Sequence, residues 1–96
     1  MEIHARVLFV TKQAQIEVVF YTKAGCHLCE DARDLLEEVA EGTEYVLTEI
    51  DIRSDMEVFE RYRYRIPVIL INGEVLLEGR IDALELVRAF RQARGE

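Results

Sequence analysis

Two cysteines, Cys26 and Cys29, are the residues of this sequence best suited to chemistry. They follow a short loop that ends in Gly25, and they stand where a segment with helical periodicity begins. At a helix N-terminus, unpaired backbone N–H groups and the positive end of the dipole stabilise a thiolate, the form of cysteine that attacks disulfides. Residues three apart lie on the same side of a helix, so a short disulfide can form between them. The spacing therefore predicts a redox-active pair.

The apolar stripe of the same helix separates the roles of the two sulfurs. Cys29 shares this stripe with Ala32, Leu36 and Val39, so we expect it to be buried. Cys26 precedes the first full turn, so we expect it to be accessible to a substrate. We therefore predict that Cys26 is the attacking nucleophile and that Cys29 resolves the mixed disulfide.

A metal site is the main alternative use of such a pair. A structural zinc site normally has four ligands, and only His4 and His27 remain as nitrogen donors. His27 lies between the cysteines and cannot easily join them on one ion. We therefore predict no metal ligands, and we favour a redox function over a metal site or a permanent structural bridge.

Two basic side chains lie close to Cys26 in the sequence. The ammonium of Lys23, three residues earlier, would favour the thiolate or bind a substrate carboxylate; a solvated loop lysine is the equal alternative. Protonated His27 would also favour the thiolate and make the disulfide more oxidising, unless it is an exposed residue without a special role.

Length and charge limit the class of protein. Ninety-six residues suffice for one domain, and 12 basic against 19 acidic residues give a net charge of −7. This balance disfavours nucleic acid and anionic membranes as partners. The chain has neither an apolar run of the roughly 18–20 residues that span a membrane nor the layout of a signal peptide. We therefore expect a cytoplasmic protein.

Periodicity and turn residues predict alternating strands and helices. Strands are expected over residues 3–10 (weakly), 16–21, 44–51, 68–71 and 74–78, and helices over 26–41, 54–63 and 82–93. Ser54 and Asp82 each precede a glutamate by three residues, which is the capping-box spacing, and Asn72-Gly73 is a hairpin signal. This order predicts an α/β fold with a mixed sheet and helices on both faces.

Three segments of the chain resemble glutaredoxins and the small glutaredoxin-like proteins of the thioredoxin-fold superfamily. Tyr21–Cys29 is similar to their active-site segment, Arg65-Ile66-Pro67-Val68 to the segment with the cis-proline, and Gly79-Arg80 to the turn before the last helix. The resemblance implies a thioredoxin-like domain over residues 16–96, with a four-stranded mixed sheet flanked by three helices. Residues 1–15 form an extension that would add a strand at the sheet edge or pair with a second molecule.

The resemblance also implies roles for individual residues. Pro67 would be cis and face the cysteines, and Ile66 would offer its backbone N–H and C=O to an extended peptide or to glutathione. Arg65, Gly79 and Arg80 join Lys23, His27, Ile66 and Pro67 as predicted substrate-binding residues. The implied activity is thiol–disulfide exchange with protein or glutathione mixed disulfides. It requires no tightly bound cofactor, with glutathione as a co-substrate and the identity of the reductant left open.

The sequence also departs from the family pattern. His27-Leu28 replaces the usual Pro-Tyr, Gly79-Arg80 replaces a double glycine, and Phe20 stands where thioredoxins carry a buried acid. A glutathione-supported iron–sulfur carrier and a non-catalytic domain therefore remain alternatives.

The residues before Pro67 alternate between tyrosine and arginine. Tyr62 is predicted to belong to the core. Two interpretations are open for Arg61, Arg63 and Arg65: they hold carboxylates of glutathione or of an acidic partner, or they form a solvated basic patch. The solvated patch is favoured for Arg61.

Overall fold

The computed structural model describes residues 15–96, so the predicted extension over residues 1–15 lies, apart from Gln15, outside the described residues. The elements follow the predicted alternation. They are β1 (Ile16–Thr22), α2 (His27–Val39), β2 (Tyr45–Asp51), the short 3-10 turn η1 (Ile52–Ser54), α3 (Met56–Tyr62), β3 (Val68–Ile71), β4 (Val75–Glu78) and α4 (Ala83–Ala93).

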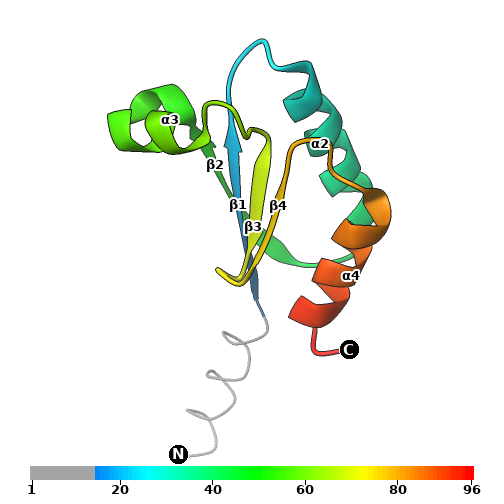
Figure 1. Cartoon of the computed structure of the whole chain (residues 1–96). Helices are drawn as coiled ribbons and strands as arrows, with labels where there is room; N and C mark the ends of the chain where they lie inside the picture. The colour runs from blue at the N-terminus through cyan, green and yellow to red at the C-terminus, as the bar shows by residue number, and fades with distance from the viewer. Residues whose placement is uncertain (1–14) are drawn as a thin grey trace, which may run out of the picture.

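The four strands form one mixed sheet in the order β2-β1-β3-β4. β1 runs parallel to β2 and antiparallel to β3, and β3 and β4 form the hairpin. Helices α2 and α4 lie on one side of the sheet, and α3 lies on the other, near the end where β1 finishes (Figure 1). The predicted α/β class, with a four-stranded mixed sheet and three helices, is thus confirmed over residues 15–96. None of the described helices is long and apolar enough to cross a bilayer.

The main core lies between the sheet and the helices α2 and α4. Alternate residues of β1, including Val18 and Phe20, point into it and meet Leu36 from α2 and Phe90 from α4. Each of these four side chains is at most 1% exposed. Burying a side chain of this size is worth roughly 1.5–3 kcal/mol, so the stripe predicted for α2 fixes this helix against β1. The loop between them, which leads from the end of β1 to Cys26 at the start of α2, is thereby anchored at both ends.

A smaller cluster on the other face of the sheet positions α3. It contains Ile52, Tyr62 and Val68, with Tyr21 packed against them. The rings of Tyr21 and Tyr62 stack with their centroids 4.3 Å apart. The prediction that Tyr62 belongs to the core is therefore confirmed. Because Tyr62 is the last residue of α3, this cluster also fixes where the chain starts toward Pro67.

The predicted helix starts and the predicted hairpin can be compared with the structure. The residue that caps α3 is Asp55, whose carboxylate accepts a hydrogen bond from the N–H of Val58 at 3.1 Å. The prediction of Ser54 as the cap is wrong, because its hydroxyl instead donates to the carbonyl of Asp51 at 2.7 Å and closes η1. Asp82 does precede α4, although its side chain makes no capping hydrogen bond. Asn72 and Gly73 both have positive φ, as a two-residue hairpin turn requires, so the hairpin is confirmed.

Candidate redox site

Cys26 is the N-cap residue of α2. Its backbone is extended, and its Sγ accepts a hydrogen bond from the backbone N–H of Cys29 at 3.1 Å. The two cysteines form a disulfide, with their Cα atoms 5.2 Å apart. The Cys26 sulfur thus occupies the position where a capping oxygen usually sits, at the positive end of the helix dipole. After reduction, the same N–H group would point at the Cys26 thiolate.

The two sulfurs differ in their access to solvent, as the helical stripe predicts. Cys29 is only 1% exposed and belongs to the main core, together with Ala32 and Leu36. Cys26 is half-buried and packs against the edge of this core. Cys26 is therefore the more accessible of the two cysteines.

The segment around Pro67 lies at the same end of the sheet. The Ile66–Pro67 peptide bond is cis, and Pro67 is among the fully buried side chains. Val68 pairs with Tyr21 near the end of β1, from which the loop to the cysteines departs. Ile66 is half-buried and packs against the same core as Cys26. The antiparallel register of β1 and β3 therefore brings the loop that leads to Cys26 and the segment around Pro67 to the same end of the sheet.

Hydrogen bonds within the chain already occupy part of this segment. The N–H of Ile66 donates to the carbonyl of Tyr62 at 3.1 Å, so this group is engaged rather than offered to a substrate. The Ile66 carbonyl accepts no hydrogen bond from the residues that the structure describes. The N–H of Gly79 donates to the carbonyls of Pro67 at 2.9 Å and of Arg65 at 3.2 Å. Gly79, with its φ of +71°, thus ties the end of β4 to the proline segment.

The two arginines predicted to bind substrate lie in different surroundings. Arg65 is bound to Glu78 of β4, with Nε 2.7 Å from Oε1, and its guanidinium lies 5.2 Å from the centroid of the Tyr62 ring. The hydrogen bond from Arg65 lowers the pKa of Glu78 below its usual value. Arg80 instead lines a cavity of about 240 Å³ together with Leu28 and Asp31 of α2. The structure therefore places Arg80 beside the cysteine helix, whereas Arg65 braces the proline segment against β4.

Lys23 and His27 also differ in their surroundings. The His27 side chain is 97% exposed, and its Nδ1 lies 4.0 Å from a carboxylate oxygen of Glu30. Lys23 is half-buried and lines a cavity of about 320 Å³ into which Cys29 also faces. Asp51 lines this cavity too, and the charge of Lys23 contributes, after the hydrogen bonds from Arg53, to lowering the pKa of Asp51.

The family of this chain follows from a direct match. The family model of the Glutaredoxin-like domain (DUF836) matches residues 17–91, which include both cysteines and Pro67. The chain belongs to the glutaredoxin-like domain family. It is 29% identical over 73 residues to the glutaredoxin-like protein YDR286C homolog of Dictyostelium discoideum, a match that covers 70% of this chain and 68% of that protein.

Solved structures agree on the fold of this glutaredoxin-like domain. The protein XcR50 from X. campestris superposes with a TM-score of 0.65 at 24% identity, covering 78% of this chain and 96% of that one. A mutant thioredoxin from Halobacterium salinarum NRC-1 also gives a TM-score of 0.65, at 19% identity, covering 94% of this chain and 84% of that one. The chain thus has a thioredoxin fold, and this fold with a disulfide-bonded C-x-x-C pair supports a redox function.

Sequence reasoning missed the charged groups beside Cys29 in this glutaredoxin-like domain. The larger cavity is lined by Arg33 from α2 and by Glu49 and Asp51 from β2. Arg33 donates from Nε to Glu49 at 2.9 Å, and its guanidinium lies 5.4 Å from the centroid of the Phe20 ring. The parallel register pairs Phe20 with Glu49, whose side chain is 41% exposed and paired with Arg33, so Glu49 is not a buried acid. Residues 45–51 show no clear alternation that would have indicated this, because the position of Glu49 depends on how β2 pairs with β1.

The described residues contain no group of three or more His, Cys, Asp or Glu side chains placed to hold a metal ion. His27, the imidazole nearest the cysteines in the sequence, points its nitrogen toward Glu30 at the surface, and Cys29 is buried in the core.

Proposed function

We propose that this chain is a cytoplasmic thiol–disulfide oxidoreductase that reduces protein or glutathione mixed disulfides through Cys26 and Cys29. The observation that carries the proposal is the position of the Cys26 sulfur, accessible at the start of α2 and accepting the N–H of Cys29 at 3.1 Å. A hydrogen bond to the charged form of a group favours that form, and so does the positive end of a helix. Cys26 is therefore the sulfur that is ionised more readily in the reduced protein.

The first step is attack by the Cys26 thiolate on one sulfur of the substrate disulfide. A bond forms between Cys26 and this sulfur, the substrate S–S bond breaks, and the other substrate sulfur leaves as a thiolate that takes a proton from water. In the second step the Cys29 thiol loses its proton to solvent and attacks the Cys26 sulfur. The first substrate sulfur then leaves as a thiolate. The substrate has gained two electrons, and the protein is left with its Cys26–Cys29 disulfide.

A thiol reductant must then reverse these steps on the protein disulfide. We propose that glutathione supplies the two electrons as a co-substrate, and that the chain uses no resident cofactor. Two glutathione molecules would be joined in a disulfide while Cys26 and Cys29 return to thiols. The substrate-binding residues in this proposal are Lys23, His27, Arg65, Ile66, Pro67, Gly79 and Arg80.

The Ile66 carbonyl is the backbone group we propose for substrate pairing. It accepts a hydrogen bond from an N–H group of an extended substrate segment, as an added strand would provide. Because the Ile66 N–H is engaged with Tyr62, this pairing uses one hydrogen bond rather than two. Pro67, next to it, is buried and carries no N–H that would compete for the substrate.

The test compares Cys26→Ser with Cys29→Ser in the full chain. We expect Cys26→Ser to lose reduction of hydroxyethyl disulfide and of a glutathionylated peptide completely. We expect Cys29→Ser to retain the first step and to accumulate a covalent adduct between Cys26 and the substrate, detected by intact mass. The assignment of roles would be contradicted if Cys26→Ser kept full activity. It would also be contradicted if Cys26→Ser formed an adduct on Cys29 and released the product at the wild-type rate.

A further inference from the structure

The last turn of α3 and the residues that follow it carry a group of basic side chains in a chain with a net charge of −7. Of the three arginines, Arg65 is bound to Glu78. Within residues 15–96 no carboxylate lies within ion-pair distance of Arg61 or Arg63, although Glu57 and Glu60 are on the same helix. Two exposed guanidinium groups therefore have no partner from this part of the chain.

The guanidinium of Arg63 nevertheless lies close to two aromatic rings. It lies 4.8 Å from the centroid of the Phe59 ring and 4.8 Å from the centroid of the Tyr64 ring. Contacts of this kind restrict the rotamers of a long side chain. The N–H groups of the guanidinium remain available for an anion, and less conformational entropy is lost when one binds.

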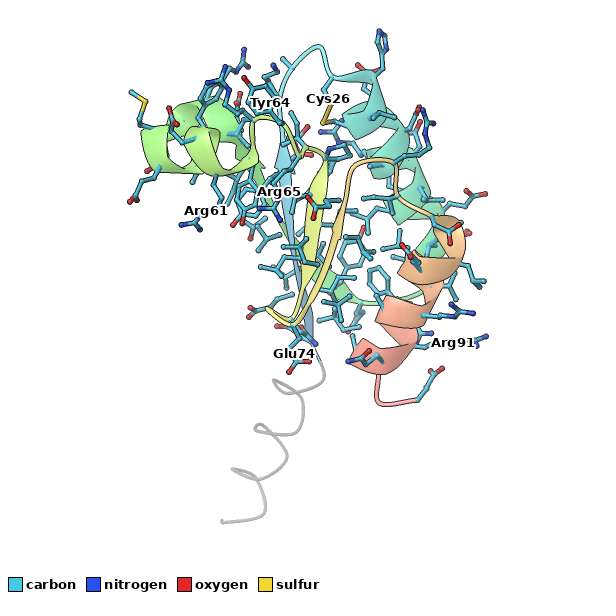
Figure 2. The ribbon with its side chains drawn as sticks, viewed as in Figure 1. Cys26, Arg61, Tyr64, Arg65, Glu74 and Arg91 are labelled. Atoms are coloured by element: carbon cyan, nitrogen blue, oxygen red, sulfur yellow. A yellow bond between two sulfur atoms is a disulfide. The ribbon has the colours of Figure 1, made fainter. Side chains whose placement is uncertain are left out.

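Tyr64 completes this surface. Its side chain is the most exposed large apolar group in the described part of the chain, at 86%. Tyrosine and arginine are enriched among the residues that carry binding energy at protein interfaces. We call Phe59, Arg63 and Tyr64 the arginine–tyrosine surface. Arg61 is not part of it, because its guanidinium lies toward the Tyr62 ring, 6.0 Å from the ring centroid, and away from Tyr64 (Figure 2). Unlike a lone charged residue, the arginine–tyrosine surface offers a cation that no described carboxylate pairs with, between two aromatic rings.

The arginine–tyrosine surface is continuous with the proposed site of chemistry. Tyr62 anchors the end of α3 in the core, and its carbonyl accepts hydrogen bonds from Arg65 at 2.8 Å and Ile66 at 3.1 Å. Tyr64 is thus two residues before the carbonyl proposed to pair with substrate. Figure 2 shows Tyr64 and Cys26 toward the same end of the sheet, where β1 finishes. A segment paired with Ile66 would extend across this surface.

We propose that the arginine–tyrosine surface binds an acidic segment of a protein substrate, next to the disulfide that Cys26 attacks. This inference rests on the proposed function and specifies its substrate class. Arg63 would bind a carboxylate of this segment bidentately, and Tyr64 would pack against a neighbouring side chain of the segment. The rest of this acidic protein repels such a segment, so the attraction acts mainly at this surface and orients the substrate.

The test uses two peptide disulfides that differ only in charge. One carries two glutamates beside its cysteine, and the other carries glutamines at these positions. We expect the wild-type chain to favour the acidic peptide about tenfold in kcat/KM, a difference that shrinks at high salt. We expect Arg63→Gln, combined with Tyr64→Ser, to bring the ratio of the two kcat/KM values close to one. Arg91→Gln, an exposed arginine of α4, is the matched control and should leave the ratio at its wild-type value.

A binding measurement separates this proposal from the proposed function. The oxidised chain is titrated into fluorescent peptides whose cysteine is replaced by serine, so that no exchange occurs. The acidic peptide should bind more tightly than its glutamine counterpart, and Arg63→Gln should abolish the difference, whether or not the chain turns over hydroxyethyl disulfide. Equal binding of both peptides to the wild-type chain would overturn the proposal. So would an Arg63→Gln effect confined to glutathione disulfide, which would assign the surface to glutathione.

Discussion

The two segments that meet at one end of the sheet are built in different ways. The cysteine site is local: within four residues, Cys26 caps α2, accepts the N–H of Cys29 and is bonded to its sulfur. The segment from Tyr62 to Pro67 depends on residues far away in the sequence. Tyr62 stacks on Tyr21, Arg65 binds Glu78, and Gly79 donates to Pro67.

This difference suggests a division of labour between reactivity and recognition. A helix start suffices to favour a thiolate, so the reactivity of Cys26 should respond little to changes elsewhere in the chain. The proline segment takes its shape from β1 and β4, so changes there should alter stability and substrate choice while sparing the sulfur chemistry. Substitutions in each segment test this division, beginning with the largest expected effect.

Tyr62→Ala should produce the largest loss of stability of any single substitution in these two segments. It removes a ring that is 7% exposed and stacks on Tyr21, and it leaves a cavity between α3 and the sheet. We expect the free energy of unfolding to fall by about 3–5 kcal/mol, measured by urea denaturation. Tyr62→Phe keeps the ring and should cost about 1 kcal/mol or less. A loss for Tyr62→Ala as small as that for Tyr62→Phe would show that α3 does not depend on this contact.

The next effect concerns Cys26 in the reduced protein. We expect its pKa to lie below the value of about 8.5 for a free thiol, because the Cys29 N–H and the start of α2 stabilise the thiolate. The rate of alkylation by iodoacetamide, followed against pH with mass mapping of each cysteine, measures it. His27→Ala should leave this pKa almost unchanged, since the His27 side chain is 97% exposed and its charge is screened by solvent. If the pKa of Cys26 in His27→Ala returned to the free-thiol value, the imidazole of His27 would be the group that lowers it.

Glu78→Gln should lower stability less, by removing the ion pair through which Arg65 links the proline segment to β4. The pair with Arg65 is partly exposed, at 43% for Glu78 and 40% for Arg65, so its loss should lower the free energy of unfolding only slightly. The loss should shrink at 1 M salt, because screening already weakens the pair in the wild-type chain. Urea denaturation at low and high salt measures both values, with Glu74→Gln in the exposed hairpin turn as a neutral control. If the loss in free energy of unfolding caused by Glu78→Gln did not depend on salt, the ion pair would make no electrostatic contribution to stability.

The features predictable from the sequence are those set by short-range rules. The apolar stripe through Cys29 and Leu36, and the turn at Asn72-Gly73, depend on residues within a few positions of each other. The predicted cap of α3 is wrong by one residue because Ser54 and Asp55 are both good capping residues. The hydroxyl of Ser54 is used to close η1, and no local pattern shows this.

The features that could not be predicted depend on strand register and on chain segments that meet in space. Arg65 and Glu78 meet only because β3 and β4 pair, and Glu49 reaches the cavity beside Cys29 only because β2 pairs with β1. The Ile66 N–H is engaged because the last turn of α3 continues past Tyr62, whose carbonyl accepts two hydrogen bonds. A resemblance supplies the residue types at such places, but not the hydrogen bonds that they make.

The smallest expected effect concerns Asp51, at the end of β2 beside the same cavity. Hydrogen bonds from the Arg53 side chain and backbone, with a lesser contribution from the charge of Lys23, lower the pKa of Asp51 from 3.8 to about 2. Because the folded-state pKa lies below the unfolded value, the ionised carboxylate stabilises the fold above about pH 4, and this contribution fades as pH falls toward 2.

The variant Asp51→Asn should therefore be less stable than the wild-type chain near neutral pH, by an amount that shrinks as the pH falls from about 4 to 2. The difference should be small, because the Asp51 side chain is 46% exposed and solvent screens its charge. Urea unfolding of both chains at several pH values between about 2 and 6 measures it, since the titration of all other carboxylates is common to the two. A difference that stays constant or widens with acid would mean that Asp51 stabilises β2 as a neutral hydrogen-bond acceptor.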